Sequence, residues 1–430
     1  MMATALLLRQ VNVLEGPGQP PSRRDVWLDG RQLRDWSLDP SGMPLASPPA
    51  RELEASGWWL APPLVDPHSV LEDPWLGRSE TLSSLALAAA TGGYGTVALL
   101  PWAKPWRDRP ERLQLAWQAP LRLSLWGSFS AEGTDDELAL QAEQLAAGAL
   151  GVSGSDHLPP LALLERGLRL GELGQHPVLL SPRDPSLTQE GFVRERVEAL
   201  RAGWPTDPAL SETLPLQTVL SLRAIHPAVA LRLMNLSTAE AVSLLRAHPD
   251  PPPASVSWWH LLADSGRLHP ADEGWRVVPS LGGPADRQAL LAALREGLLS
   301  AVAVHHQALD AEEQLLPVDQ RKVGVAGHGI ALPMLWHELV DRQGWSPEEL
   351  WQVLCWGPSR FLAMPQDHLA CPTERWVLWD PDHTWTPSAR ELGTLAANVP
   401  TVALNGLRGR VIASGLLAED RWPLATALRC

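Results

Sequence analysis

The feature that most constrains the fold is a regular alternation of short apolar segments with amphipathic ones between residues 57 and 304. Apolar runs that predict strands cover residues 57–66, 95–101, 121–125, 150–153, 176–180, 229–234, 254–258, 276–279 and 300–304. Helical spacing predicts helices at residues 81–90, 135–147, 161–173, 189–202, 211–223, 238–247 and 286–296. Such alternation is typical of parallel strands joined by crossover helices, and the number of repeats favours a closed, TIM-like (β/α)8 barrel over an open sheet.

Both ends of the chain are expected to form β structure. Strands are predicted at residues 6–13, 25–30, 375–381 and 407–415, the last two after helical pieces at residues 330–342, 347–355 and 359–363. The simplest arrangement pairs the two ends in one small accessory domain beside the barrel. The predicted class is therefore α/β, with a β domain made of residues 1–56 and 366–430 and a barrel made of residues 57–365.

The composition is that of a large globular protein, with 430 residues, 45% of them hydrophobic and 20% charged. A formal charge of -14 disfavours nucleic acid and anionic membranes as partners, because binding phosphates requires clustered basic side chains, and Lys104 and Lys322 are the only lysines. Three widely separated cysteines predict neither a disulfide framework nor a thiolate metal cluster, and they favour the cytoplasm. No run approaches about 18 apolar residues, so neither a signal peptide nor a membrane span is expected.

The first barrel strand ends in a polar run, Asp-Pro-His-Ser-Val at residues 66–70. In a parallel barrel, chemistry occurs at the carboxyl ends of the strands. Alternate residues of a strand point to the same side, so two histidines at positions i and i+2 could bind one metal ion. Val70 offers a hydrocarbon where the second imidazole would be needed. A lone histidine such as His68 is more often a hydrogen-bonded residue than a metal ligand.

Together with Pro74, this run resembles the Asp-Pro-His-x-His-Leu-Arg-Glu-Pro segment of dihydroorotases, which belong to the metal-dependent amidohydrolase superfamily. Val70 stands at the second His of that segment and Glu72 at the Arg. The resemblance continues with Leu-Ser-Thr-Ala at residues 236–239 and Ala-Glu-Glu at residues 311–313. It extends over nearly the whole chain and implies the barrel fold.

The resemblance also implies that the positions carrying the family's chemistry are altered. Trp102 stands where the family has a substrate-contacting Asn, and Val278 falls at the Asn of its Asn-Pro-Pro-Leu-Arg segment. Ser181 and Asn235 stand at two metal-binding His positions. The general base of the family is an Asp, and His305 takes its place.

His68 and Asp156, a match for the bridging carboxylate, are the remaining candidates for a metal site. We therefore expect a noncatalytic dihydroorotase-like protein of pyrimidine biosynthesis that needs no cofactor. The resemblance implies a partner, because noncatalytic dihydroorotase-like chains associate with aspartate transcarbamoylase in some bacteria. A homo-oligomer is also expected.

Two other functions stay open. The first is an active dihydroorotase, or another cyclic-amide hydrolase, with an unconventional zinc site built from His68, Asp156, His305 and His306. The second is a barrel that binds a small apolar metabolite, with Trp102, Trp258 and Trp259 around its mouth. Bound zinc would favour the hydrolase, and co-purification with aspartate transcarbamoylase would argue against the metabolite carrier.

Overall fold

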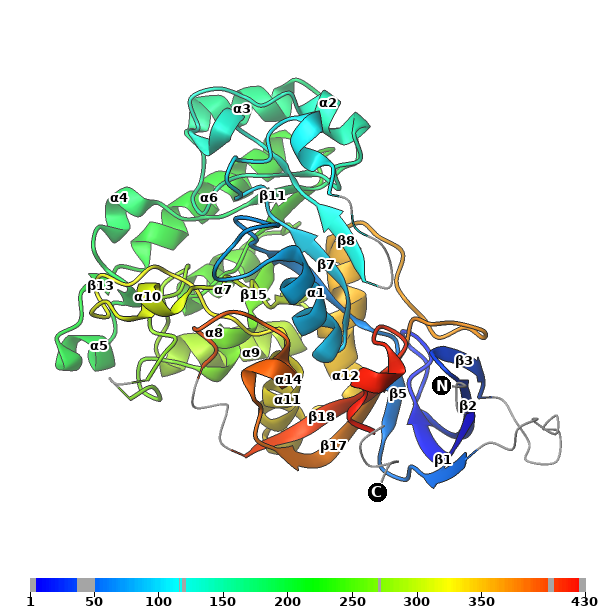
Figure 1. Ribbon diagram of the computed structural model, residues 1–430. Helices are drawn as coiled ribbons and strands as arrows, with labels where there is room; N and C mark the ends of the chain where they lie inside the picture. The colour runs from blue at the N-terminus through cyan, green and yellow to red at the C-terminus, as the bar shows by residue number, and fades with distance from the viewer. Residues whose placement is uncertain are drawn as a thin grey trace.

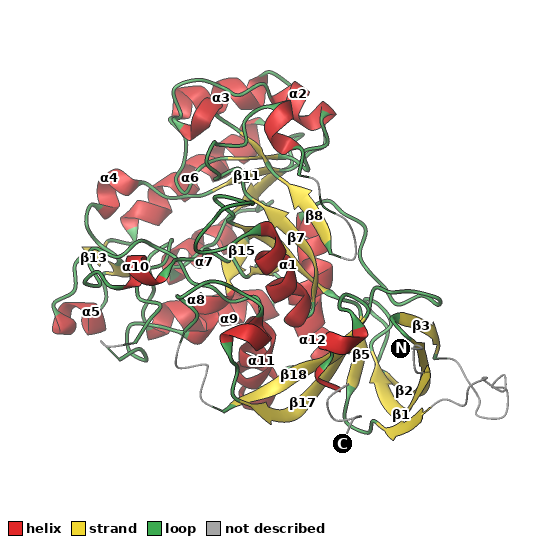
Figure 2. Cartoon of the chain, in the orientation of Figure 1, coloured by secondary structure: helices red, strands yellow, loops and turns green. Residues whose placement is uncertain are grey.

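The computed structural model describes residues 5–36, 51–115, 117, 121–269, 272–400 and 406–424. Strands lie at the centre of the main body with helices around them, and a smaller group of strands that includes β1, β2 and β3 lies to one side (Figure 1; Figure 2). The outer limits of the predicted β domain, residues 1 and 430, lie outside the described residues, as does Cys430.

The main body is a parallel barrel, as predicted. In chain order its strands are β6 (Leu64–Ser69), β7 (Tyr94–Leu99), β8 (Arg122–Leu125) with β9 (Gly127–Ser128), β10 (Val152–Ser153), β11 (Val178–Leu180), β14 (Leu231–Leu233), β15 (Ser255–Ser257) and β16 (Ala301–Ala303). Neighbouring strands pair in parallel, and a parallel bridge from Leu233 to Ala254 joins β14 to β15. The ring closes between β16 and β6, where the backbone N–H of Val70 donates to the carbonyl of His306 at 2.9 Å.

Helices follow the strands and cover the barrel. The longer ones are α1 (Leu82–Thr91), α3 (Leu161–Arg169), α6 (Leu210–Ile225), α7 (Ala239–Ala247) and α9 (Pro284–Arg295). Shorter ones are α2 (Gln141–Ala146), α4 (Pro185–Thr188), α5 (Val197–Ala202), α8 (Trp258–Leu262), α10 (Ala311–Gln314) and α14 (Ala389–Leu392). Two π-helical segments, Trp336–Arg342 and Gln352–Trp356, continue α11 (Ala331–Leu335) and α12 (Pro347–Trp351), and α13 (Gly357–Phe361) follows. Across the described residues, no helix is long and apolar enough to cross a membrane.

Both chain ends contribute to one sheet, which confirms the predicted accessory β domain. Its strands are β1 (Ala5–Val13), β2 (Ser22–Asp29), β3 (Gln32–Asp35), β4 (Arg51–Glu54), β5 (Trp59–Ala61), β17 (Val377–Trp385) and β18 (Leu407–Ser414). The order is β18-β17-β5-β1-β2-β3, with β4 also paired to β1. Strands from the two ends meet where β17 pairs antiparallel with β5.

Several predicted elements are wrong. The strand expected at residues 57–66 is two strands, β5 in the accessory sheet and β6 in the barrel, because Pro62 and Pro63 between them lack the N–H that a continuous ladder needs. Residues 276–279 form a loop. The helix expected at 189–202 is reduced to α5, and β12 (Val193–Arg194) pairs there with β13 (Thr206–Asp207). The domain boundaries at residues 57 and 366 stay predictions.

The interior of the barrel is filled with hydrocarbon. One buried cluster contains Val65, Val70, Ala98, Leu100, Trp126, Leu179, Met234, Ala301, Phe361 and Leu362. The residues flanking Leu179 in β11 belong to the larger core under the helices, so alternation places Leu179 and its cluster inside the ring. Val70 and Trp126 extend this packing to the carboxyl ends of the strands.

Candidate functional site

The barrel fold brings three of the sequence-predicted site positions together at the strand ends. His68 lies at the end of β6, Asn235 just after β14 and His305 just after β16. The Nδ1 atoms of His68 and His305 are 3.0 Å apart. The Nε2 atom of His68 is 2.8 Å from the Oγ atom of Ser255, which also accepts the backbone N–H of Asn235 at 2.9 Å.

Both histidines of this contact are neutral at physiological pH. Burial, and then the neighbouring His305, lower the pKa of His68 to about 3. Burial likewise lowers the pKa of His305 to about 4. Because a neutral imidazole has one N–H and one acceptor nitrogen, one Nδ1 atom of the pair donates and the other accepts. Both ring nitrogens of His68 are therefore engaged by protein atoms.

His306 belongs to a different contact from its neighbour His305. Its Nε2 atom is 3.1 Å from the Oε2 atom of Glu80, and its ring stacks on that of His328 with centroids 4.7 Å apart. His328 in turn lies 2.8 Å from the carboxylate of Asp66. Burial alone would raise the pKa of Asp66, but the hydrogen bond and charge of His328 hold it below its ordinary value.

Asp66 has a structural role in this arrangement. Its Oδ1 atom accepts the backbone N–H of Val304 at 3.0 Å, and the hydroxyl of Ser69 donates to its Oδ2 atom. The carboxylate thereby links the first and last strands of the barrel, where parallel pairing closes the ring. Asp66 and His328 are fully buried and do not reach solvent.

Asp156, the predicted remnant of a bridging carboxylate, is engaged by two cations. Its Oδ2 atom is 2.8 Å from Arg183, and its Oδ1 atom is 2.9 Å from the Nδ1 atom of His157. The Nε2 atom of His157 lies 3.2 Å from Asp135. Hydrogen bonds that His157 donates to Asp135 and then to Asp156 raise the pKa of His157 to about 9. This chain of ion pairs ties together the loops that follow β9, β10 and β11.

The remaining predicted positions, Trp102, Glu72 and Val278, lie in separate contacts. The ring of Trp102 meets that of His305 edge-on at 5.8 Å, and its Nε1–H donates to the carbonyl of Gly154 at 3.1 Å. Glu72 pairs with Lys104 at 2.6 Å near the surface. Val278 lies half-buried in a loop.

The donor set does not suit a zinc ion. Zinc in proteins takes nitrogen, sulfur or carboxylate ligands, whereas Val70, Ser181 and Asn235 offer a hydrocarbon, a hydroxyl and an amide. The hydroxyl of Ser181 donates to the backbone carbonyl of Asp156 at 3.0 Å. No group of three His, Cys, Asp or Glu side chains within the described ranges is placed to hold a metal ion.

The mouth of the barrel is closed around these positions. The exposed fractions of His68, Val70, Asn235 and His305 are 0%, 4%, 3% and 6%. Surface cavities of about 430 and about 690 Å³ lie elsewhere, one beside α11 and β18 and the other beside β8. Neither cavity has either member of the histidine pair in its lining.

The backbone keeps an unusual conformation at two altered positions. Asn235 and His305 both have φ of 47°. This left-handed region costs a non-glycine residue roughly 1–2 kcal/mol, although Asn tolerates it better than most. Such strain is concentrated at functional sites in proteins. The backbone is thus strained at the ends of two barrel strands, at positions that carry an amide and an imidazole side chain.

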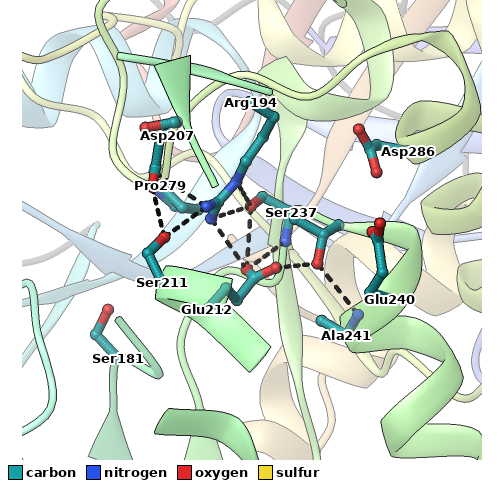
Figure 3. Close-up of polar contacts among 12 residues, drawn as sticks. Ser181, Arg194, Asp207, Ser211, Glu212, Ser237, Glu240, Ala241, Pro279 and Asp286 are labelled. Atoms are coloured by element: carbon teal, nitrogen blue, oxygen red, sulfur yellow. Dashed lines mark hydrogen bonds and ion pairs between the residues drawn. The ribbon is translucent and has the colours of Figure 1, made fainter. Parts of the chain in front are cut away.

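A buried ion network beside the mouth was not predicted from the sequence. Figure 3 shows the guanidinium of Arg194 between Asp207 and Glu212, with Ser211 and Ser237 completing its hydrogen bonds. Arg194 and Asp207 are 2.9 Å apart, and neither side chain is exposed. Glu212 also accepts the backbone N–H of Ser237 at 2.8 Å.

This network fastens β12 and β13 to the start of α6 and to the loop after β14. Burial raises the pKa of Glu212, against the opposing charge of Arg194. The only signal in the sequence was a single arginine after the apolar pair Phe192-Val193.

Comparison with known proteins identifies the family of this chain. No family model matches the chain. A protein of Synechocystis sp. described as a probable dihydroorotase-like protein is 32% identical over 391 residues, which cover 82% of this chain and 87% of the relative. The dihydroorotase of Mycobacterium leprae is 29% identical, over 96% of this chain and 99% of the relative.

Among solved structures, L-hydantoinase (dihydropyrimidinase) from Arthrobacter aurescens superposes with a TM-score of 0.76 at 17% identity, over 96% of this chain and 94% of that one. This likeness shows the fold, an α/β barrel with a β domain. The Synechocystis relative, similar over most of both sequences, shows the family. The chain belongs to the dihydroorotase-like proteins.

Proposed function

We propose that this chain is a noncatalytic dihydroorotase-like protein of pyrimidine biosynthesis, located in the cytoplasm, that acts as a structural partner of aspartate transcarbamoylase. The observation that carries the proposal is the buried contact between His68 and His305. It occupies the positions at which the family resemblance places a metal ligand and the general base.

The chemistry of this contact argues against hydrolysis. A general base works best when its pKa lies near the operating pH, whereas burial lowers the pKa of His305 to about 4. The base must also reach a water molecule or substrate, and Trp102 packs edge-on against the His305 ring. A metal ion would be needed to lower the pKa of that water, and the donor set does not suit one.

The surface around the mouth supports a docking role. Large apolar side chains are exposed on three neighbouring loops: Trp75 (57%), Leu76 (86%), Leu315 (83%), Leu316 (44%) and Leu395 (54%). We call these five residues the rim patch. An ion pair of 3.5 Å between Arg78 and Glu312 joins the first two loops, and the backbone N–H of Leu395 donates to Glu80 at 3.1 Å. Gathered apolar exposure of this kind is typical of an interaction site.

Both lysines of the chain form ion pairs with residues of the loops that carry the rim patch. Lys104 pairs with Glu72, and Lys322 pairs with Glu313. Both lysines of the chain therefore lie next to the rim patch. The hydrogen bond to Glu313, and to a lesser degree the charge of Glu72, raise the pKa of Lys322. Asp73 and Asp310 accept backbone N–H groups in the same loops, so the rim carries a small acidic excess, which disfavours a small anionic substrate.

The first experiment measures zinc and turnover. The protein is purified, saturated with zinc and dialysed, and its metal content and its rates with dihydroorotate and carbamoyl aspartate are determined. We expect far less than one zinc per chain and rates equal to the buffer blank. Stoichiometric zinc with enzyme-like turnover would instead establish the alternative, an active dihydroorotase or another cyclic-amide hydrolase.

The second experiment tests the partner and its docking face. The chain is mixed with aspartate transcarbamoylase from the same organism and treated with an amine-reactive cross-linker. We expect a complex on gel filtration and cross-links from Lys104 and Lys322 that disappear in the charge-preserving variant K104R/K322R. The variant L76D/L315D should lose the complex. Absence of any complex with the wild-type chain would refute the partner, and a complex insensitive to L76D/L315D would refute the rim patch as the docking face.

A further inference from the structure

Strand β8 differs from the other described strands of the barrel because it is not buried. One of its residues is exposed and three are half-buried. In contrast, β6, β7, β9, β10, β11, β15 and β16 are buried at every residue, and β14 at two of three. Strands of a parallel barrel are covered by helices on the outside. Figure 1 shows β8 at the margin of the main body, so its outer face lacks part of this cover.

The absent cover is a crossover helix. Each of the other crossovers between consecutive barrel strands contains an α-helix, such as α1 between β6 and β7 and α3 between β10 and β11. Between β7 and β8 the described residues form a single short 3-10 turn, Pro110–Leu113, and no α-helix. Prolines at positions 101, 105, 110 and 120 interrupt this connection, and each lacks the N–H that the interior of a helix requires. The described residues therefore leave the outer face of β8 without a helix.

A cavity of about 690 Å³ lies beside β8. Leu123 and Leu125 of β8 line it, and both also pack against the core under the helices. Leu115, Trp117 and Met364 add three more half-buried apolar side chains to its lining. We call these five residues the β8 groove. Half-buried leucines around a hollow of this size suit the apolar stripe of an amphipathic helix.

The edge of the β8 groove carries one unpaired positive charge. Three charged side chains line the cavity, namely Arg122, Glu374 and Arg375. Glu374 pairs with Arg31 at 2.5 Å, and Arg375 pairs with Asp367 at 2.5 Å. Arg122 is exposed and has no hydrogen bond or ion pair with any residue in the described ranges. A free guanidinium beside an apolar groove favours a ligand that places an acidic side chain next to it.

We propose that the β8 groove binds an amphipathic α-helix of a partner protein, in the place of the absent crossover helix, with an acidic side chain of that helix paired to Arg122. In this mode of recognition, large apolar side chains at positions i, i+3, i+4 and i+7 of the helix enter the groove. The architecture of the barrel identifies the occupant, because a helix covers the outer face of the other crossovers. The β8 groove shares no residue with the rim patch, so this contact does not depend on the function proposed above.

A model peptide tests the occupant. The probe is a fluorescein-labelled peptide of about 15 residues, long enough to populate a helix, made of Leu, Glu and Ala with its leucines on one face. A second peptide has the same composition with the leucines scattered around the helix. The wild-type chain should bind the first peptide about tenfold or more tightly than the second in fluorescence anisotropy, because several leucines are buried together. Equal affinities would overturn the proposal, as would binding of dodecanoate without binding of either peptide, which would assign the groove to a small amphiphile.

Two variants test the place of binding. L123E puts a charge into the β8 groove and should abolish binding of the first peptide, whereas L170E, at an exposed leucine at the end of α3, should bind it as the wild type does. R122E should weaken binding by about tenfold, and a peptide with Lys in place of Glu should restore it. Equal binding by L123E and L170E would contradict the site, and weakening in R122E without recovery would contradict the ion pair. A circular dichroism melt verifies that each variant is folded, and R122E alters only an exposed side chain.

Discussion

The Nδ1 atoms of His68 and His305 lie 3.0 Å apart, with both rings buried. Such a contact is stable only while at least one of the two rings is neutral, because two imidazolium ions would direct N–H groups at each other. Burial lowers the pKa of His68 to about 3 and that of His305 to about 4. The fold therefore depends on pH through this pair.

Stability should fall as the pH drops from about 6.5 toward 4. In that window an unfolded histidine, with its ordinary pKa of about 6.5, binds a proton that the folded His68 or His305 does not. The unfolded state then holds more protons, so the free energy of unfolding decreases with falling pH by up to about 1.4 kcal/mol per pH unit for each such histidine. Denaturant titrations at a series of pH values measure this slope.

The variant H305N measures the contribution of His305 to this pH dependence. Asn tolerates the positive φ of position 305 and can hydrogen-bond to His68, so stability near pH 7.5 should change little. Between pH 6.5 and 4.5 the free energy of unfolding should change less steeply with pH, by the contribution of about one proton, or roughly 1.4 kcal/mol per pH unit. H176N, at an exposed histidine, is the matched control and should keep the wild-type slope. An unchanged slope in H305N would show that position 305 does not control acid stability.

His157 should produce the opposite dependence on the alkaline side. Hydrogen bonds that it donates to Asp135 and Asp156 raise its pKa to about 9, so between about pH 6.5 and 9 the folded state holds a proton that the unfolded state has released. The stability it contributes is fully present below about pH 6.5 and is lost as the pH rises through 9. H157N should flatten the fall in stability between pH 7 and 9 in urea titrations, and a persistent fall would contradict the assignment.

The strand ends could be predicted from the sequence because apolar runs and helical spacing are local signals. The sequence placed His68, Asn235 and His305 at strand ends through the order of the motifs, and the structure brings these residues together at the ends of β6, β14 and β16. What the sequence could not supply were contacts between distant residues, such as Asp66 with His328 and Glu80 with His306. Each contact joins segments more than 200 residues apart in the sequence. A periodic pattern within one segment carries no information about which distant segment it contacts.

The Arg194 network was missed for a different reason. Its strands β12 and β13 have two residues each, which is too short for an alternating apolar pattern to be detected in the sequence. The surrounding residues 189–202 have helical spacing, yet only α5 forms, because Arg194 is held by Asp207 instead. Tertiary ion pairing thus overrides a local preference.

Removing Arg194 should destabilise the fold strongly. R194M leaves Asp207 and Glu212 buried without a cation, and breaking a buried pair by removing one partner costs about 3–5 kcal/mol. The matched control is R246M, which breaks the exposed pair of Arg246 with Glu296 and should cost at most about 1 kcal/mol. The double variant R194M/D207N should recover part of the lost stability, because it also removes the unpaired negative charge of Asp207. Similar unfolding midpoints for R194M and R246M would show that the network does not stabilise the fold.

Restoring the family's residues at two positions should not restore activity. V70H/E72R rebuilds the His-x-His pattern and the substrate-binding Arg, but Ser181, Asn235 and His305 remain. The new imidazole would enter the apolar cluster that contains Trp126, so it should cost about 1–3 kcal/mol. We expect no zinc-dependent turnover of dihydroorotate and a lowered free energy of unfolding.

The single variant E72R separates the two effects. It breaks only the exposed pair with Lys104, so its stability should stay within about 1 kcal/mol of wild type, and the loss in V70H/E72R can be assigned to position 70. Turnover by V70H/E72R above that of E72R would mean that the other altered positions still support chemistry. That result would refute the argument that Ser181, Asn235 and His305 prevent hydrolysis, and would assign the missing activity to position 70 alone.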